Sequence, residues 1–375
     1  MKRKENGITI LNLIILIAII VACFFIYSTY INDTNVKTSS TNKIEISNDT
    51  SLKINATEKQ NDVEGKNASA GIENIVLSEN VTKGSSDLQS NSENDFTRYY
   101  YNQIDNTAKS MYNDVLKNED KLISGTGIIE FTTKELGAEN RFQTAWDALC
   151  MDHPELFFID TNKLSLKTRT TKSFFGAKTT YDYFLEPSDN SNYYASPFES
   201  ETDVRQAIST LNTYVDAITQ EANNRRTTYD KVKFVHDYLV NNTSYAETEG
   251  NNTSNLYGAL VNHLAVCEGY AESFKYLMDK LNIPCVVVYG DGLKLDGSAD
   301  YHAWNYVKMD NENWYAVDAT WDDPIIIGEG RLLERDKYIY FLKGSNSFSK
   351  RHVEKGDVSG TGQNFTYPVI STNDY

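Results

Sequence analysis

The sequence predicts an α+β protein in which a helix that carries a cysteine packs on an antiparallel sheet. A smaller α+β unit and an N-terminal transmembrane helix precede this core. Three observations predict these elements. Apolar residues recur at helical spacing in 96–125 and again from residue 201. The segment 162–186 alternates and is rich in Thr, Tyr and Phe, as strands are, and residues 8–31 are almost entirely apolar. The chain of 375 residues is long enough for two domains.

The N-terminal segment is typical of a membrane anchor. Residues 1–7 form a basic leader, and the apolar run 8–31 is long enough to cross a bilayer, which takes about 20 residues. Basic residues before the span place the N-terminus in the cytoplasm and the rest of the chain outside. Beyond residue 30 the chain has 33 basic and 51 acidic residues, a net charge of −18. We therefore expect a single-pass protein of the cell membrane with an acidic, extracytoplasmic body.

Two other kinds of processing fit the same segment. The stretch GITILNLIILIAII resembles the type IV prepilin leader, in which a basic part ends in a glycine, here Gly7, although Asn12 stands where pilins carry a glutamate. Residues 20–23 match a lipoprotein box, which the apolar FFIY follows. An uncleaved anchor, cleavage after Gly7 and lipidation would all give the same topology.

Residues 32–95 are predicted to form a disordered polar linker. They contain no Phe, Trp or Tyr, and Ser, Thr, Asn, Lys and Glu dominate. Such a segment cannot bury enough apolar surface to offset the entropy that ordering would cost. The folded structure is therefore expected in 96–375, where the acidic excess argues against a nucleic-acid partner and favours basic or amine-bearing ones.

Residues 96–195 are expected to form the smaller α+β unit. Its helical spacing in 96–125 is carried by Ile104, Ala108, Met111, Tyr112, Val115 and Leu116. A second helix is predicted at 140–150, and 162–186 is predicted to form strands. This unit carries no residue to which the sequence assigns chemistry.

Residues 196–375 are predicted to form the main domain. A long helix begins at Glu201, with its apolar face on Val204, Ala207, Ile208, Leu211, Tyr214, Val215 and Ile218, and a second helix runs through 232–239. The Asn-rich stretch 241–255 has no apolar run, so we expect a loop there that could border a functional site.

Cys267 is the first candidate for chemistry. It directly precedes apolar residues at helical spacing, and a buried strand is predicted at 284–289 after that helix. At a helix N-terminus, free backbone N–H groups and the helix dipole favour an anion, and the thiolate is the nucleophilic form of cysteine. The alternative is that Cys267 is a small apolar residue that packs at the start of a buried helix.

His302 and Asp318 lie in two aromatic-rich runs, HAWNYV and NWYAVDATWDDP, separated by a polar stretch. These runs predict an antiparallel hairpin. If Tyr306 pairs with Trp314, His302 falls opposite Asp318 on the same face of the sheet, where the carboxylate would orient the imidazole. The alternative is a structural histidine and an aspartate that ends a strand.

Taken together, VCEGYA, HAWN and WYAVDATWDDP resemble the motifs of the transglutaminase-like superfamily. The resemblance covers about residues 200–370 and implies a papain-like core with a catalytic triad of Cys267, His302 and Asp318. It further implies acyl transfer through a cysteine thioester, without a metal or another cofactor. The N–H of Cys267 would be one oxyanion donor, and Tyr257 is the candidate for a second.

Other titratable residues show weaker patterns. His263 lies four residues before Cys267 and could support the site, or it could pack locally. Cys285 lies in an apolar run, and Cys150 ends an apolar helical stretch, so both are expected to pack, although the sequence leaves a bridge between them open. The histidines have no spacing that predicts a metal site.

These observations predict a bacterial, membrane-anchored transglutaminase-like thiol enzyme. Its substrates would be proteins or peptides, such as cell-surface proteins or wall peptides within reach of the linker. Transamidation, which forms cross-links, and hydrolysis by a cysteine peptidase of the same fold both remain open. A catalytically idle surface domain that binds or scaffolds other proteins is the alternative from another class.

Overall fold

The computed structural model describes residues 96–172, 178–188, 191–294, 296–323, 334–358 and 364–375. Internal contacts divide the chain into residues 1–50 and 51–375, and every described residue belongs to the second unit. The predicted leader, anchor and linker, residues 1–95, lie outside the described residues. Within the described part of the chain, no helix is both long and apolar enough to cross a bilayer.

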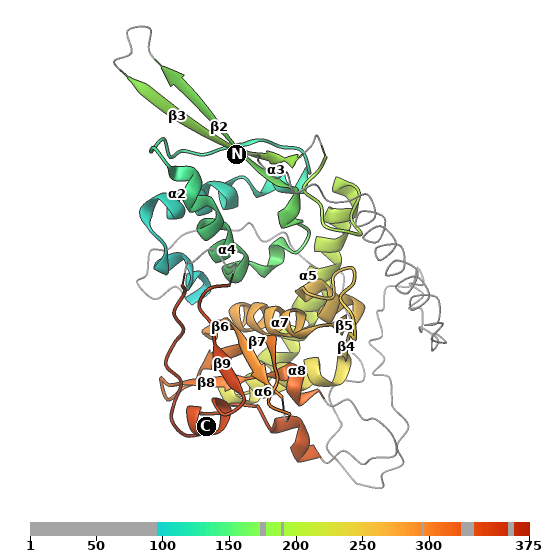
Figure 1. Cartoon of the computed structure of the whole chain (residues 1–375). Helices are drawn as coiled ribbons and strands as arrows, with labels where there is room; N and C mark the ends of the chain where they lie inside the picture. The colour runs from blue at the N-terminus through green and yellow to red at the C-terminus, as the bar shows by residue number, and fades with distance from the viewer. Residues whose placement is uncertain (1–95, 173–177, 189–190, 295, 324–333, 359–363) are drawn as a thin grey trace, which may run out of the picture. The chain divides into compact units, whose positions relative to one another are not determined.

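The described residues up to 195 form helices and a small antiparallel sheet (Figure 1). The helices are α2 (Asn106–Lys117), α3 (Glu119–Ile123) and α4 (Phe142–Asp152), and the strands, in the order β1-β3-β2, are β1 (Ile129–Glu130), β2 (Leu164–Lys172) and β3 (Thr179–Pro187). Short 3₁₀ turns lie at Phe96–Arg98, Tyr101–Gln103, Ala138–Arg141, Pro154–Leu156 and Thr161–Lys163. The predicted helices and strands are confirmed, except that the helical pattern in 96–125 is divided at Asn118, whose φ of −112° and ψ of 25° interrupt the helix.

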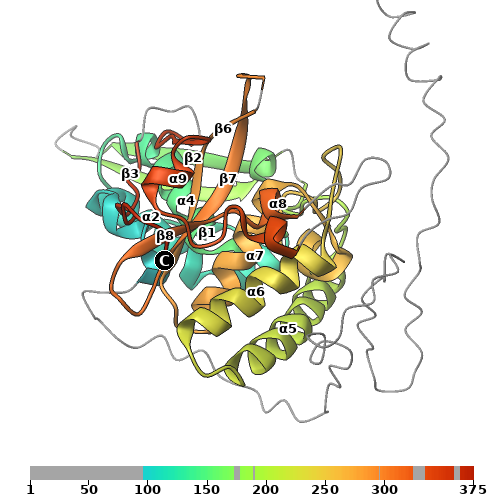
Figure 2. The same ribbon diagram turned by 90° about the horizontal axis from the view of Figure 1, so that it is seen from below.

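A layer of helices follows. Helix α5 (Glu201–Asn223) begins with a capping box, in which Ser200 and Asp203 bond each other's backbone N–H groups. Helix α6 (Thr228–Asn242) packs against α5, and both contact α7 (Cys267–Lys280), as Figure 2 shows. The predicted loop 241–255 contains a short strand, β4 (Ser244–Tyr245). This strand pairs in parallel with β5 (Leu264–Ala265), which follows a π-helical turn at Gly258–Asn262 and leads into α7.

The central antiparallel sheet supports α7. Its strands, in the order β8-β7-β6-β9, are β6 (Cys285–Leu293), β7 (Ala299–Lys308), β8 (Trp314–Val317) and β9 (His352–Glu354). Helix α7 packs on β6 and β7 (Figure 1). The remaining helical segments are α8 (Ala319–Asp322), a 3₁₀ segment at Glu334–Tyr338, and α9 (Ser345–Phe348). The predicted α+β core, a cysteine-bearing helix on an antiparallel sheet, is thus the observed one.

The hairpin of β7 and β8 forms as predicted, but the predicted register is wrong by two residues. Trp314 pairs with Lys308, and Tyr306 pairs with Ala316. The turn explains the shift: the N–H of Met309 donates to the carbonyl of Asn313 over 3.0 Å, and the residue before Asn313 takes a left-handed conformation, which closes a loop of three residues. A shift of two residues keeps every side chain on its predicted face.

The core is continuous between the early helices and the sheet. Tyr100 is fully buried, its hydroxyl donates to the carbonyl of Val287 in β6, and its ring meets Phe365 edge to face at 5.3 Å. Asp152, at the end of α4, accepts hydrogen bonds from the N–H groups of Tyr100 and Tyr101. The boundary between domains at residues 195 and 196 stays a prediction.

Candidate active site

Cys267 is the first residue of α7, as predicted. Strand β5 delivers the chain to this point, and Val266 is the residue before the helix. The cysteine side chain packs with Ala271, Val287 and Ala303, and only 8% of the residue is exposed. The N–H groups of the first helical turn have no partner within the helix, so they are available to an oxyanion at this thiol.

His302 lies on β7 and interacts both with the thiol of Cys267 and with the carboxylate of Asp318. Its Nε2 lies 2.8 Å from Oδ2 of Asp318, and the thiol of Cys267 lies within hydrogen-bonding reach of the same imidazole. Because Nε2 is engaged by the carboxylate, Nδ1 is the nitrogen left for the thiol. Burial by itself lowers the pKa of His302, but the charge and hydrogen bond of Asp318 and the contact with Cys267 outweigh it and raise that pKa to about 10.

Asp318 is the N-cap of α8 and is buried. Its Oδ1 accepts a hydrogen bond from the N–H of Trp321 over 3.0 Å, while Oδ2 faces His302. Burial would raise the pKa of this carboxyl, but the neighbouring imidazoles hold the pKa well below its usual range. Asp318 is therefore ionised and His302 is an imidazolium at neutral pH.

The structure thus brings together the three residues that the sequence singled out. A thiol at a helix start, an imidazolium and a buried carboxylate lie in a row. This arrangement can stabilise a thiolate nucleophile next to a proton donor.

His352 also belongs to the site, although no pattern in the sequence assigns it a role. Its Nε2 lies 2.9 Å from Oδ2 of Asp318, the same oxygen that His302 contacts, and the residue is 3% exposed. Burial is the main reason that the pKa of His352 is lowered, against the opposing influence of Asp318. His352 lies on β9, and its pairing opposite Gly292 on β6 brings it beside the hairpin. No spacing rule predicts the contact between His352 and Asp318, which lie 34 residues apart in the sequence.

Aromatic rings enclose the two histidines. Trp321 stacks on His302 with ring centroids 4.9 Å apart, and it also contacts His352 at 4.6 Å. The guanidinium of Arg351 lies 5.3 Å from the Trp321 ring centroid. A low-dielectric surrounding of this kind strengthens the interaction between His302 and Asp318.

Tyr257 and His263, the two supporting candidates, have other neighbours. Tyr257 stacks on Phe157 at 5.1 Å and meets Phe198 edge to face at 6.0 Å, which are the contacts of a packing residue. His263 takes a left-handed conformation and packs against Tyr214 at 5.9 Å, and burial lowers its pKa. Their proposed support of the site stays a prediction.

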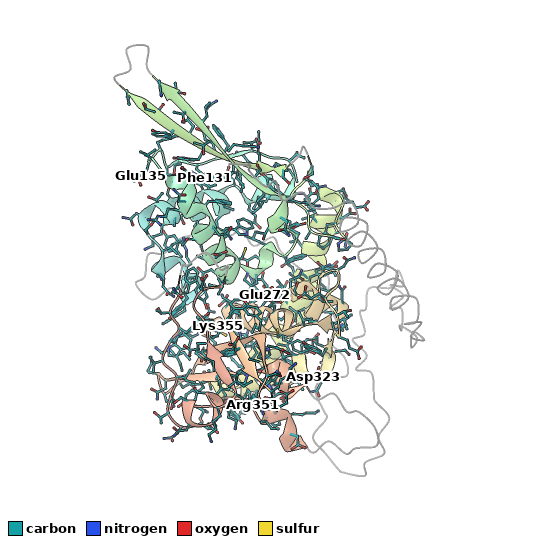
Figure 3. The ribbon with its side chains drawn as sticks, in the orientation of Figure 1. Phe131, Glu135, Glu272, Asp323, Arg351 and Lys355 are labelled. Carbon is teal, nitrogen blue, oxygen red and sulfur yellow. The ribbon has the colours of Figure 1, made fainter. Side chains whose placement is uncertain are left out.

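Acidic groups lie on the same helix as the thiol. Burial and the charge of Glu249 raise the pKa of Glu268, and His302 opposes this rise. Burial and Glu268 raise the pKa of Glu272, which Figure 3 places on α7, well above its usual range. One further carboxylate, Asp323, accepts a hydrogen bond of 2.6 Å from the hydroxyl of Tyr270.

The other described cysteines are free thiols, and no bridge joins Cys150 to Cys285 in the structure. Burial raises the pKa of both thiols, which makes them poor nucleophiles at neutral pH. Among the described residues, one group has the donor types and spacing that could hold a metal: His302, Asp318 and His352. Hydrogen bonds from both Nε2 atoms to one carboxylate oxygen account for this grouping, so we assign no metal to it.

Residues 212–319 match the model of the transglutaminase-like superfamily. The matched segment runs from within α5 to the first residue of α8 and contains Cys267, His302 and Asp318. The chain therefore contains a domain of the transglutaminase-like superfamily.

Several solved structures are similar to this chain. A TGase is 15% identical over 55% of this chain and 53% of its own, with a TM-score of 0.28. The periplasmic domain of TgpA from Pseudomonas aeruginosa, bound to ethylmercury, is 17% identical over 43% of this chain and 66% of its own, with a TM-score of 0.25. A protein from Cytophaga hutchinsonii is 16% identical over 44% of this chain and 68% of its own, with a TM-score of 0.27. The chain thus spans between about half and two thirds of these solved chains, and no curated protein matches it significantly.

Proposed function

We propose that this protein is a membrane-anchored, extracytoplasmic thiol enzyme that transfers acyl groups from protein or peptide amides through a thioester on Cys267. The observation that carries this proposal is the unbroken series of contacts from the thiol of Cys267 through His302 to the buried Asp318. The other described cysteines have no comparable imidazole partner and have raised pKa values.

In the first half of the reaction, the Cys267 thiolate attacks the carbonyl carbon of an amide. The oxyanion that forms accepts a hydrogen bond from the N–H of Cys267, at the start of α7. The His302 imidazolium then gives its proton to the leaving nitrogen, the C–N bond breaks, and a thioester remains. Asp318 keeps the imidazole in the required orientation throughout.

In the second half, neutral His302 takes a proton from the acceptor as the acceptor attacks the thioester. If the acceptor is an amine, a new amide forms, and if it is water, a carboxylic acid forms. Either way the carbon–sulfur bond breaks and Cys267 is regenerated as a thiolate beside an imidazolium. The class of acceptor that reaches the thioester therefore decides between transamidase and cysteine peptidase.

The activity test uses the full-length chain with casein and a fluorescent primary amine. Amine incorporation with ammonia release would support transamidation, and new peptide termini would support proteolysis. Both should vanish in Cys267→Ala and persist in the matched control Cys150→Ala. A chain that does neither, and whose Cys267 is no more reactive toward iodoacetamide than a free thiol, would contradict the proposal and favour an idle binding or scaffold domain.

The proposed location rests on the basic leader and the apolar run 8–31. An anchored enzyme on a long polar linker could reach surface proteins or wall peptides, which we propose as substrates. Protease added to intact cells should remove the folded part, whereas a chain that is protected until the cells are lysed would contradict the proposed topology. A mature N-terminus at Ile8 would indicate prepilin-type processing instead of an uncleaved anchor.

A further inference from the structure

We propose that His352 is a second positioning histidine of this site, which holds the carboxylate of Asp318 in the orientation that His302 requires. This inference rests on the proposed thiol chemistry and deepens it. It assigns a function to a residue outside the segment 212–319 that matches the superfamily model.

The first observation is the set of hydrogen bonds on Asp318. Its Oδ2 lies 2.8 Å from Nε2 of His302 and 2.9 Å from Nε2 of His352, and its Oδ1 lies 3.0 Å from the N of Trp321. These three partners come from β7, β9 and the first turn of α8. Because they approach both oxygens from separate elements, the carboxylate cannot turn without breaking at least one bond. Without His352, Oδ2 would keep only His302 of these partners.

The second observation is the rigid support of the His352 ring. It stacks on Phe348 with centroids 3.8 Å apart and an interplanar angle of 13°, and it meets the edge of Trp304 at 5.0 Å. The side chain is fully buried among these rings. Burying a polar imidazole is unfavourable unless it is hydrogen-bonded. A role confined to packing would suit phenylalanine at this position, whereas the histidine adds a donor that points at Asp318.

The protonation states of the two histidines fit this division of roles. His302 has a raised pKa and carries the mobile proton, whereas the lowered pKa of His352 keeps it neutral. A neutral His352 in the Nε2–H form donates to Asp318 without adding charge. The single carboxylate is then balanced by a single imidazolium.

The third observation is the close fit of β9 against β6. A Cβ on Gly290 would lie 2.1 Å from the carbonyl oxygen of Val353, and a Cβ on Gly292 would lie 2.7 Å from the Trp321 ring and 3.3 Å from Cβ of His302. The absence of a side chain at Gly290 lets β9 lie close enough for His352 to reach Asp318, and its absence at Gly292 leaves room for Trp321 and His302. The C-terminal segment therefore completes a site whose Cys267, His302 and Asp318 lie within the matched segment.

The test measures the alkylation rate of Cys267 by iodoacetamide in the full-length chain, followed by mass spectrometry between pH 5 and 9. His352→Phe keeps a flat ring but removes the donor, and His352→Gln keeps a donor near the position of Nε2. We expect the rate at pH 7 to fall about 10- to 100-fold in His352→Phe, as activity does when the outer hydrogen-bond partner of a metal-bound histidine is lost. His352→Gln should recover most of that loss.

Phe348→Leu is the matched control, because it loosens the stacking on His352 but leaves the donor in place. It should lower the melting temperature while Cys267 stays reactive. An unchanged rate in folded His352→Phe would overturn the role of His352 alone, and so would equal losses in folded His352→Phe, His352→Gln and Phe348→Leu. An unreactive Cys267 in the wild-type chain would instead overturn the proposed function, and with it this role.

Discussion

The protonation state of His302 depends on one buried carboxylate, and the variant Asp318→Asn tests this directly. In the wild-type chain Nε2 of His302 donates to Oδ2 of Asp318, and the pKa of His302 is about 10. Asparagine has nearly the same shape but no charge. We expect it to bond Trp321 N through its oxygen, which turns its NH₂ group toward the histidine. Two donors would then face each other unless His302 adopts the tautomer that carries its proton on Nδ1.

The size of the effect follows from the pKa of His302. A tenfold change in a protonation equilibrium corresponds to 1.36 kcal/mol, so raising the pKa from 6.5 to about 10 favours the imidazolium by on the order of 5 kcal/mol. Without the carboxylate, burial dominates, and burial lowers the pKa of a histidine. We therefore expect His302 in Asp318→Asn to titrate below 6.5.

The assay is NMR of the full-length chain with ¹³C-labelled histidine. The chain contains only five histidines, so each Cε1–H signal can be assigned with a single substitution. In the wild type, the signal of His302 should titrate at a higher pH than the signals of His263 and His352, because burial lowers the pKa of both of these histidines. A His302 signal that titrates near pH 10 in Asp318→Asn, or near 6.5 in the wild type, would refute the reasoning.

Three further outcomes follow from the same structure. The difference in unfolding free energy between the wild type and Asp318→Asn, measured with urea, should be largest between about pH 4 and 6.5. It should shrink as pH rises toward 10, because the folded histidine then loses its proton, and as pH falls below 4, where the unfolded carboxylate is protonated first. Gly290→Ala, whose Cβ would meet Val353 O, should destabilise the fold by about 1–3 kcal/mol and slow alkylation, whereas Gly297→Ala, which meets nothing within 4 Å, should leave alkylation unchanged. Asp152→Asn should lower the unfolding free energy, measured with urea, by about 1–3 kcal/mol. The reason is that the NH₂ group of asparagine would face the buried groups that donate hydrogen bonds to Asp152 in the wild type. An unchanged unfolding free energy would contradict this reasoning.

Periodicity predicted most of the fold because the apolar faces of the helices are the buried ones. The residues that predicted the helix from Glu201, including Val204, Leu211 and Ile218, are buried in α5. The position of Cys267 at the start of a helix could be predicted for the same reason, because the apolar residues at helical spacing begin directly after it. These are local features, and local features are what a single sequence reveals well.

The register of the hairpin could not be fixed from the sequence. It depends on the left-handed conformation of Glu312, which glutamate adopts rarely and which closes the three-residue loop. His352 was missed because its position depends on the pairing of β9 with β6, a contact between segments about 60 residues apart. Proximity to Cys267 in the sequence suggests Tyr257 as an oxyanion donor, but it does not reveal that this ring stacks on Phe157.

A second buried pair in the same fold separates the chemistry of the site from the general effect of a buried ion pair. Nε2 of His236 lies 3.1 Å from Oδ2 of Asp322, and both side chains are fully buried. Burial raises the pKa of Asp322 to about 6 even against the influence of His236, whereas the pKa of Asp318 is held well below its usual range. Burial lowers the pKa of His236, but Asp237 and Asp322 outweigh it and raise that pKa. No thiol takes part.

The variant His236→Gln should therefore lower the stability of the fold without lowering the reactivity of Cys267. Removing one partner of a buried pair commonly destabilises a protein by about 3–5 kcal/mol. We expect a decrease toward the lower end of that range, measured by urea unfolding, because glutamine keeps one hydrogen bond to Asp322. The alkylation rate of Cys267 should stay within about twofold of wild type, since none of the contacts of His302 change. If the rate instead fell as far as we expect in His352→Phe, α8 would couple the two pairs, and the triad could not be treated as an independent unit.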